Sequence, residues 1–243
     1  MRVLAIGIHP DDVEISCGGT VALLARRGDE VMILDLTRGE SSTNGTPEVR
    51  AREAEAATRI LGVARRVNAG LPDTGLRSEE PDQVRTIVRL LRATRPHVVL
   101  LPYANDPHPD HMAGGLLSQH AVFLSNVNGY ATEEGGKRQE RWRVPRSLVY
   151  SGRREVRPDV VMDVTAVYET KVAAIRAHES QVGGGEGTLS TPLTDPRFMA
   201  VVEARDRLAG RRIGATFGEA FELFAPLALH DFAALVSPED DRR

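Results

Sequence analysis

The tripeptide His-Pro-Asp occurs twice in this 243-residue chain, within His9-Pro10-Asp11-Asp12 and within His108-Pro109-Asp110-His111. At this composition a given histidine is followed by Pro-Asp by chance in about 0.4% of cases. Two copies among 7 histidines therefore indicate a motif with a chemical role.

The residue types in the two motifs suit a catalytic metal site. Zinc in a hydrolase takes three His or carboxylate ligands and keeps one position open for water. His9, Asp12 and His111 would supply two imidazoles and one carboxylate. Pro10 fixes a backbone φ between the first two of them. We therefore predict a Zn2+ site at these three residues, although ligand type leaves Fe2+ or another divalent ion open.

The remaining polar residues of the motifs predict the proton chemistry. Asp11 is a carboxylate next to the expected metal, where a general base takes a proton from water. His108, as an imidazolium, would stabilise an oxyanion or protonate the leaving amine. Asp110 would orient one of the histidines.

A purely structural interpretation of each motif stays open. Asp110 precedes a predicted helix and would serve as its N-cap. Asp11 and Asp12 would form a solvated acidic turn, and His9 would be a hydrogen-bonded core residue. The location of both motifs at one edge of one predicted sheet favours the catalytic interpretation. The other histidines carry weaker signals: His97 and His120 are expected to be structural, and His178 is a candidate for the rim of the site.

Apolar runs and helical periodicity predict the elements that position these residues. Strands are expected at Val3–Ile8, Glu30–Leu36, near Val67, and at His97–Leu101, Leu148–Tyr150 and Asp159–Met162. Helices are expected at Val21–Arg27, Glu48–Leu61, Gln83–Thr94, Met112–Leu124 and Ala166–His178. Gly62 is placed to end the second of these helices.

Strands that alternate with helices predict right-handed crossovers and a Rossmann-like α/β fold, with a mostly parallel sheet and helices on both faces. Such sheets bind ligands beyond the carboxyl ends of their strands, where both motifs fall. We see no linker or repeat, so we expect one domain over residues 1–243 with a less regular C-terminal half. The segment Gly183–Thr188 is expected to be flexible.

Composition and charge narrow the class of protein. The net charge of −3 argues against a nucleic-acid-binding surface. Apolar runs are too short for a membrane span, and the N-terminus lacks the pattern of a signal peptide. The single cysteine, Cys17, is expected to be a buried apolar residue. These features argue against nucleic-acid and membrane partners and predict a cytoplasmic protein.

At the two motifs the sequence resembles the PIG-L/LmbE-type zinc deacetylases of N-acetylglucosamine conjugates. Their signature pairs His-Pro-Asp-Asp-x-Glu, here His9 to Glu14, with His-Pro-Asp-His, here His108 to His111. The resemblance implies an N-acetyl hydrolase with zinc on His9, Asp12 and His111, Asp11 as base and His108 at the oxyanion. It extends to Thr37–Glu40, Asn44–Thr46, Arg50, Glu53, Lys171, Ser180–Gln181 and Gly218–Phe221.

The pattern is nearest to the branch that deacetylates N-acetylglucosaminyl-L-malate in bacillithiol biosynthesis. Relatives from the mycothiol pathway carry a tyrosine two residues before the second motif, where this chain has Asp106. No role of that tyrosine is therefore carried over. Resemblance to this branch also implies a homo-oligomer, with hexamers among its members.

A malate group would bring two carboxylates to the site, and these need local positive charge. Arg50, at the start of a predicted helix after the Thr37–Pro47 loop, is the first candidate because its planar fork suits a carboxylate. Arg38, inside the loop, is the second. Asn44, in the loop that resembles the family, is also expected to contact the substrate.

Three other functions remain open at this stage. The chain could deacetylate a different N-acetylglucosamine compound: the free sugar, an oligomer, or a mycothiol or antibiotic precursor. It could be a nucleotide-binding protein, but His-Pro-Asp-Asp replaces the expected Gly-x-Gly-x-x-Gly and would repel a pyrophosphate. It could be a non-catalytic metal-binding module, which would not need Asp11.

Overall fold

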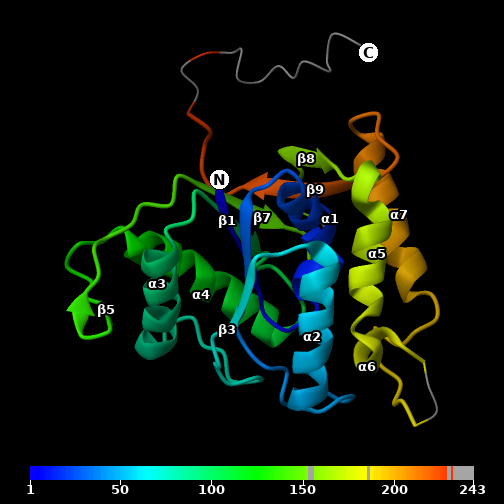
Figure 1. The fold of residues 1–243 in the computed structure, drawn as a ribbon, viewed down its shortest axis with the longest axis horizontal. Helices are drawn as coiled ribbons and strands as arrows, with labels where there is room; N and C mark the ends of the chain where they lie inside the picture. The colour runs from blue at the N-terminus through cyan, green and yellow to red at the C-terminus, as the bar shows by residue number, and fades with distance from the viewer. Residues whose placement is uncertain (153–155, 185–186, 229–230, 232–243) are drawn as a thin grey trace.

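Seven strands form one twisted sheet in the computed structural model, which describes residues 1–152, 156–184, 187–228 and 231. The strand order is β3-β2-β1-β4-β7-β9-β8 (Figure 1). Strands β3 to β7 in this order are parallel, and β9 is antiparallel to both of its neighbours. The predicted α/β fold with a mostly parallel sheet is confirmed. The strands are β1 Arg2–Gly7, β2 Glu30–Asp35, β3 Arg65–Asn68, β4 Val98–Pro102, β7 Arg146–Tyr150, β8 Val160–Asp163 and β9 Gly218–Leu223, and β5 Glu133–Glu134 pairs with β6 Lys137–Arg138 in a separate hairpin.

Helices cover both faces of the sheet and create two hydrophobic cores. In β1, Val3 and Ala5 enter one core while Leu4 and Ile6 enter the other, as expected for a strand buried on both faces. The first core packs against α1 Asp12–Arg26, α2 Pro47–Leu61 and α5 Tyr168–Arg176, and the second against α3 Pro81–Thr94 and α4 Pro109–Ser125. The remaining helices are η1 Thr165–Val167, α6 Glu179–Val182 and α7 Phe198–Arg211, which packs against β9.

The chain changes direction across the sheet between β1 and β4. From β1 it proceeds outward to β2 and β3, then returns to β4 on the other side of β1. The helix after β1 lies on one face and the helix after β4 on the other (Figure 1). The loops that follow these two strands therefore diverge at the carboxyl edge of the sheet, the position where open α/β sheets bind ligands. Both His-Pro-Asp motifs lie at this edge.

Helix α1 begins at Asp12 and not at Val21, as the sequence suggested. Its first half is buried almost all round and includes Val13 and Cys17, so it lacks the amphipathic period that marks a surface helix. The helix is kinked at Cys17, whose φ is −141°. Beyond the kink, the carboxylate of Glu219 accepts hydrogen bonds from the backbone N–H groups of residues 19 and 20 at 2.8 and 2.6 Å. Glu219 thereby satisfies donors that a kink releases. Helix α7 and strand β9 were not predicted either.

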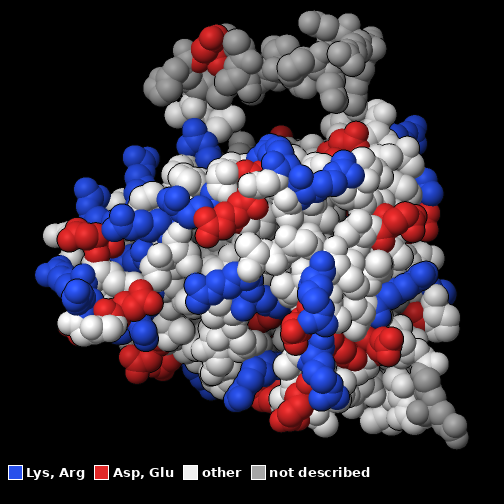
Figure 2. Space-filling model, viewed as in Figure 1, with Lys and Arg blue, Asp and Glu red and all other residues white. Residues whose placement is uncertain are grey.

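The surface carries charged residues of both signs (Figure 2). Basic and acidic side chains are interspersed on the face shown in Figure 2. No helix within the described part of the chain has both the length and the apolar character needed to cross a bilayer. Cys17 is fully buried, as predicted. Within the Gly183–Thr188 segment, Gly185 and Glu186 lie outside the described residues.

Candidate active site

The first motif forms a strained turn between β1 and α1. Asp11 is the N-cap of α1, with φ 141° and ψ −26°, a backbone conformation that residues other than glycine rarely adopt. Oδ2 of Asp12 accepts hydrogen bonds from the backbone N–H groups of Ile8 and His9 at 3.0 and 2.8 Å. These bonds hold His9, Asp11 and Asp12 in one tight turn. Strained residues of this kind cluster at functional sites.

The second motif forms the start of α4. His108 is the N-cap, and its Nδ1 accepts a hydrogen bond from the backbone N–H of Asp110 at 3.2 Å, while Pro109 occupies the first helical position. The N-cap is therefore His108 and not Asp110, which the structural interpretation had suggested. When Nδ1 accepts this bond, Nε2 is the ring nitrogen of His108 that carries a proton and can donate.

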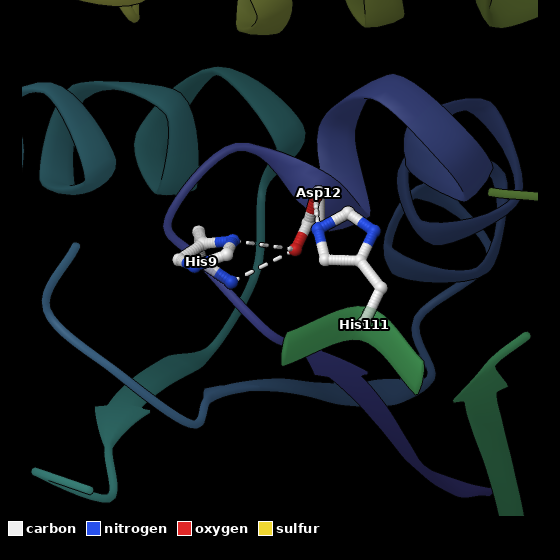
Figure 3. Close-up of side chains that lie close together, drawn as sticks. All are labelled: His9, Asp12 and His111. Carbon is white, nitrogen blue, oxygen red and sulfur yellow. Dashed lines mark hydrogen bonds and ion pairs between the residues drawn. The ribbon is translucent and has the colours of Figure 1, made fainter. Parts of the chain in front are cut away.

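At the carboxyl edge of the sheet, His9, Asp12 and His111 come together from the two motifs (Figure 3). Nδ1 of His9 is 3.6 Å from Oδ2 of Asp12, and Nε2 of His111 is 3.4 Å from Oδ1 of Asp12. One donor atom from each residue lies within 4.8 Å of the other two. Two imidazole nitrogens and one carboxylate oxygen so placed match the three protein ligands of a catalytic zinc site.

In His9 and in His111, the ring nitrogen that does not face Asp12 lies near a further carboxylate. Nε2 of His9 lies 3.0 Å from Oδ1 of Asp73 and 3.8 Å from Oδ2 of Asp110. Nδ1 of His111 lies 3.5 Å from Oδ1 of Asp106. Carboxylates in this position orient metal-binding histidines and fix the tautomer that exposes the other nitrogen.

Sequence reasoning assigned no function to Asp73 or Asp106. Asp73 follows β3 and Asp106 follows β4, so both lie at the carboxyl edge of the sheet. The rule that directed attention to residues after β1 and β4 would also have found these two carboxylates.

The electrostatics of the site favour a bound cation. Burial lowers the pKa of His9, but its hydrogen bonds to Asp110, Asp12 and Asp73 more than offset this and raise the pKa well above its usual value. Burial raises the pKa of Asp12, whereas His111 and His9 outweigh it and hold this pKa far below its usual value. Carboxylates concentrated around imidazole nitrogens need compensating positive charge, and a divalent ion can supply it. The donor set and its charge thus fit such an ion.

Arg50 is buried beside Asp11. Its side chain is 3% exposed, and Nη2 donates to Oδ2 of Asp11 at 3.1 Å and to the carbonyl oxygen of Pro10 at 2.8 Å. These two bonds hold Arg50 against the turn that carries Asp11, while its predicted role in substrate binding stays a prediction. A Cβ on Gly39, whose φ is +64°, would lie 2.0 Å from Nη1 of Arg50, so glycine is required there.

The burial of Asp11 suits a proton acceptor. Burial raises the pKa of Asp11, and the positive charge of Arg50 opposes this effect only in part. A carboxyl group with a raised pKa is a better base near neutral pH.

Two other predicted substrate contacts lie in the loop after β2. Arg38 is exposed there. The carboxamide of Asn44 instead binds the backbone of Leu189, donating to its carbonyl oxygen at 2.9 Å and accepting from its N–H at 2.9 Å. Asn44 therefore ties the loop to a distant segment, and its expected contact with the substrate stays a prediction.

His178 is fully buried, so the prediction that it lies on the rim of the site is wrong. Its Nε2 lies 3.4 Å from Oε1 of Glu14, in the first turn of α1.

Comparison with known proteins identifies the kind of protein that carries such a site. The profile of the PIG-L family, described as GlcNAc-PI de-N-acetylase, matches residues 4–122. The diacetylchitobiose deacetylase of Thermococcus kodakarensis is 32% identical over 195 residues, which cover 74% of this chain and 70% of that protein.

A second relative acts on a different conjugate of the same sugar. The 1D-myo-inositol 2-acetamido-2-deoxy-alpha-D-glucopyranoside deacetylase 2 of Saccharopolyspora erythraea is 29% identical over 248 residues, which cover 80% of this chain and 89% of that protein. Among solved structures, the conserved protein TT1542 from Thermus thermophilus superimposes with a TM-score of 0.83 at 35% identity. The superposition covers 93% of this chain and 96% of that one.

Proposed function

Since this chain belongs to the PIG-L family of GlcNAc-PI de-N-acetylases, we propose that it is a metal-dependent hydrolase that removes the N-acetyl group from an N-acetylglucosamine conjugate. The observation that carries this proposal is the convergence of His9, Asp12 and His111 beside the buried carboxylate of Asp11. The names of both curated relatives support the substrate class, because each describes a deacetylase of an N-acetylated glucosamine compound.

Each of these residues would have a separate role in amide hydrolysis. A divalent cation held by His9, Asp12 and His111 would supply positive charge that acidifies water and polarises the amide carbonyl. Asp11 accepts a proton from the attacking water at its carboxylate as the new C–O bond forms. His108 donates from Nε2–H to the carbonyl oxygen as that oxygen gains negative charge. Asp11 then returns the proton to the amine nitrogen as the C–N bond breaks, which yields acetate and the free amine.

We propose zinc as the metal, with iron as the alternative that ligand chemistry allows. Metal analysis of the purified protein decides between them. Asp12→Ala and His111→Ala should each lose metal and activity together, because removing one of three ligands removes most of the affinity. Full metal occupancy in either variant would show that the ligand assignment is wrong.

We propose N-acetylglucosaminyl-L-malate as the substrate, on the basis of the sequence resemblance and of the exposed Arg38 in the loop after β2. The test is an amine-release assay on the malate conjugate, diacetylchitobiose and free N-acetylglucosamine. A preference for the malate conjugate in kcat/KM would support this substrate. A preference for diacetylchitobiose would keep the deacetylase and replace the substrate.

We also propose that the protein forms a homo-oligomer. Met112, Leu116 and Phe123 are 49%, 38% and 71% exposed, and their spacing places them along one side of α4. Apolar side chains exposed in a row are typical of a protein contact surface. Light scattering during size-exclusion chromatography measures the assembly, and a monomer at micromolar concentration would contradict the proposal.

A further inference from the structure

Charged side chains gather around the first turn of α1, behind the candidate base. They are largely buried and interact with one another, although they come from separate segments of the chain. We call them the buried charge cluster: Asp11, Glu14, Asp35, Arg50, Arg66 and His178.

Two guanidinium groups in this cluster form ion pairs with three carboxylates. Arg66 donates from Nε and Nη2 to both oxygens of Asp35, at 2.7 and 2.9 Å. The same guanidinium donates from Nη1 to Oε1 of Glu14 at 2.5 Å. Arg50 is paired with Asp11. Arg66 alone faces both Glu14 and Asp35, so with these two acids ionised one negative charge is left without a counter-ion.

A buried carboxylate charge without compensation is costly, so the cluster needs one more cation. His178 is fully buried, and its Nε2 lies 3.4 Å from Oε1 of Glu14. Burial lowers the pKa of His178, but the negative charge of Glu14 more than offsets this and raises the pKa above its usual value. Of the other charged groups that act on the ring, Asp11 favours the imidazolium and Arg66 opposes it.

The contact between His178 and Glu14 depends on charge more than on a directed hydrogen bond. Within the described part of the chain, neither ring nitrogen of His178 has a hydrogen-bond partner of good geometry, and neither has Oε2 of Glu14. In either protonation state the ring leaves these buried polar atoms without a directed hydrogen bond. An imidazolium gains the attraction of the nearby carboxylate.

The residues that follow His178 hold its backbone in place. The backbone N–H and the hydroxyl of Ser180 donate to the two carboxylate oxygens of Glu53 in α2, at 2.6 and 2.7 Å. Nε2 of Gln181 donates to the carbonyl oxygen of Asn44 at 2.7 Å. This short segment therefore connects α1, α2 and the loop after β2, the three parts of the chain that surround Asp11.

We propose that His178 is a positioning residue of the active site, whose imidazolium neutralises the carboxylate charge that Arg66 leaves uncompensated on Glu14 and Asp35. Arg66 can then pair with both Asp35 and Glu14, while Arg50 remains paired with Asp11. The effect on turnover rests on the proposed role of Asp11 as base, whereas the charge balance does not.

A double-mutant cycle in thermal unfolding tests the charge balance without any activity assay. His178→Gln removes the cation and Glu14→Gln removes the excess carboxylate. In the wild-type background His178→Gln should lower Tm by roughly 6–20 °C, the scale of a broken buried ion pair in a chain of this size. In the Glu14→Gln background it should lower Tm by less than about half as much. Equal losses in both backgrounds would mean that His178 acts through packing alone and would overturn the proposal.

The control and a second measurement complete the test. Glu179→Gln changes an exposed acid in the next position and should leave Tm unchanged. If His178→Gln does not fold, the nitrogen chemical shifts of His178 in the isotope-labelled wild type at pH 7 report its protonation directly. An imidazolium supports the proposal and a neutral ring contradicts it.

Turnover provides the link to the active site. His178→Gln should keep its metal and KM and lose roughly 10-fold or more in kcat, because Asp11 is less well held. If Tm follows the cycle while the wild type itself has no deacetylase activity, the proposed function fails and the charge balance stands. If Tm follows the cycle and kcat is unchanged, the positioning role is wrong.

Discussion

One guanidinium holds both the side chain and the backbone of the strained turn at the candidate base. Nη2 of Arg50 lies 3.1 Å from Oδ2 of Asp11 and 2.8 Å from the carbonyl oxygen of Pro10. The φ of 141° at Asp11 needs support of this kind, because the surrounding contacts must offset the cost of an unusual backbone conformation.

Arg50→Ala should therefore lower the activity of the enzyme whether or not the substrate carries a carboxylate. The substitution leaves Asp11 as an uncompensated buried charge, so we expect a loss of about 3–5 kcal/mol in the free energy of unfolding. kcat should fall by a similar factor on N-acetylglucosaminyl-L-malate and on diacetylchitobiose. Steady-state kinetics and urea unfolding measure both effects, with exposed Arg52→Ala as the matched control in the same helix. A loss confined to the malate conjugate would support the interpretation of Arg50 as a substrate ligand.

Asp11→Asn should separate the proton chemistry from metal binding. The amide keeps the size of the side chain but cannot accept a proton, so we expect normal metal content and a loss of about 10²-fold or more in kcat/KM. His108→Ala should also keep the metal and lose a comparable factor, because it removes the Nε2–H donor. Metal analysis and kinetics on the same preparations check both variants. Turnover near the wild-type level in Asp11→Asn would remove Asp11 from the mechanism.

Asp106 should tune the affinity for metal through His111. Oδ1 of Asp106 accepts a hydrogen bond from the backbone N–H of His108 at 2.9 Å and lies 3.5 Å from Nδ1 of His111. Asp106→Asn keeps this oxygen and removes the charge, so metal affinity should fall by about 10–100-fold. Competition with a chelator measures the affinity without an activity assay. Asp82→Asn, in a side chain that is 93% exposed, is the control. Unchanged affinity in Asp106→Asn would show that this carboxylate does not act on the metal site.

The stabilising effect of His178 should disappear at alkaline pH. The folded state raises the pKa of His178 above the unfolded value of 6.5, so the folded protein binds the proton more tightly. The contribution is complete below pH 6.5 and is lost as the pH rises through the folded value. The difference in unfolding free energy between wild type and His178→Gln should therefore shrink with rising pH. Urea unfolding of both proteins between pH 6 and 9, roughly the window in which a raised histidine titrates, measures this difference. A constant difference would indicate a contribution from packing.

Arg38 is the second candidate for binding an acidic substrate. It is exposed in the loop after β2, so a contact with a carboxylate should contribute at the lower end of the range for charged hydrogen bonds. Arg38→Ala should reduce kcat/KM for the malate conjugate by roughly 10-fold and leave free N-acetylglucosamine unaffected. Comparable losses on both substrates would indicate that Arg38 supports the loop and does not recognise the malate group.

The local sequence was sufficient for the strands of the sheet other than β9, for most helices and for the residues of the two motifs that meet at the carboxyl edge of the sheet. The strands β1, β2 and β4 are short apolar runs, and α2 has both a clear period and Gly62 at its C-terminal end, with φ 70°. His9, Asp12 and His111 could be selected together because each belongs to a repeated motif placed after a strand. The carboxyl ends of neighbouring parallel strands share one edge, so a sequence pattern can place such residues near one another.

Only the tertiary structure decided which charges pair inside the molecule. Arg50 meets Asp11 across 39 positions of sequence, Arg66 meets Glu14 across 52, and His178 reaches Glu14 from a segment still farther along the chain. Local periodicity extends over a few residues and contains no information about such distant partners. The start of α1 was missed for a related reason, because a helix buried all round has no polar face to reveal its period. The energy of a buried charge depends on its nearest counter-charge, and that neighbour exists only once the helices have packed against the sheet.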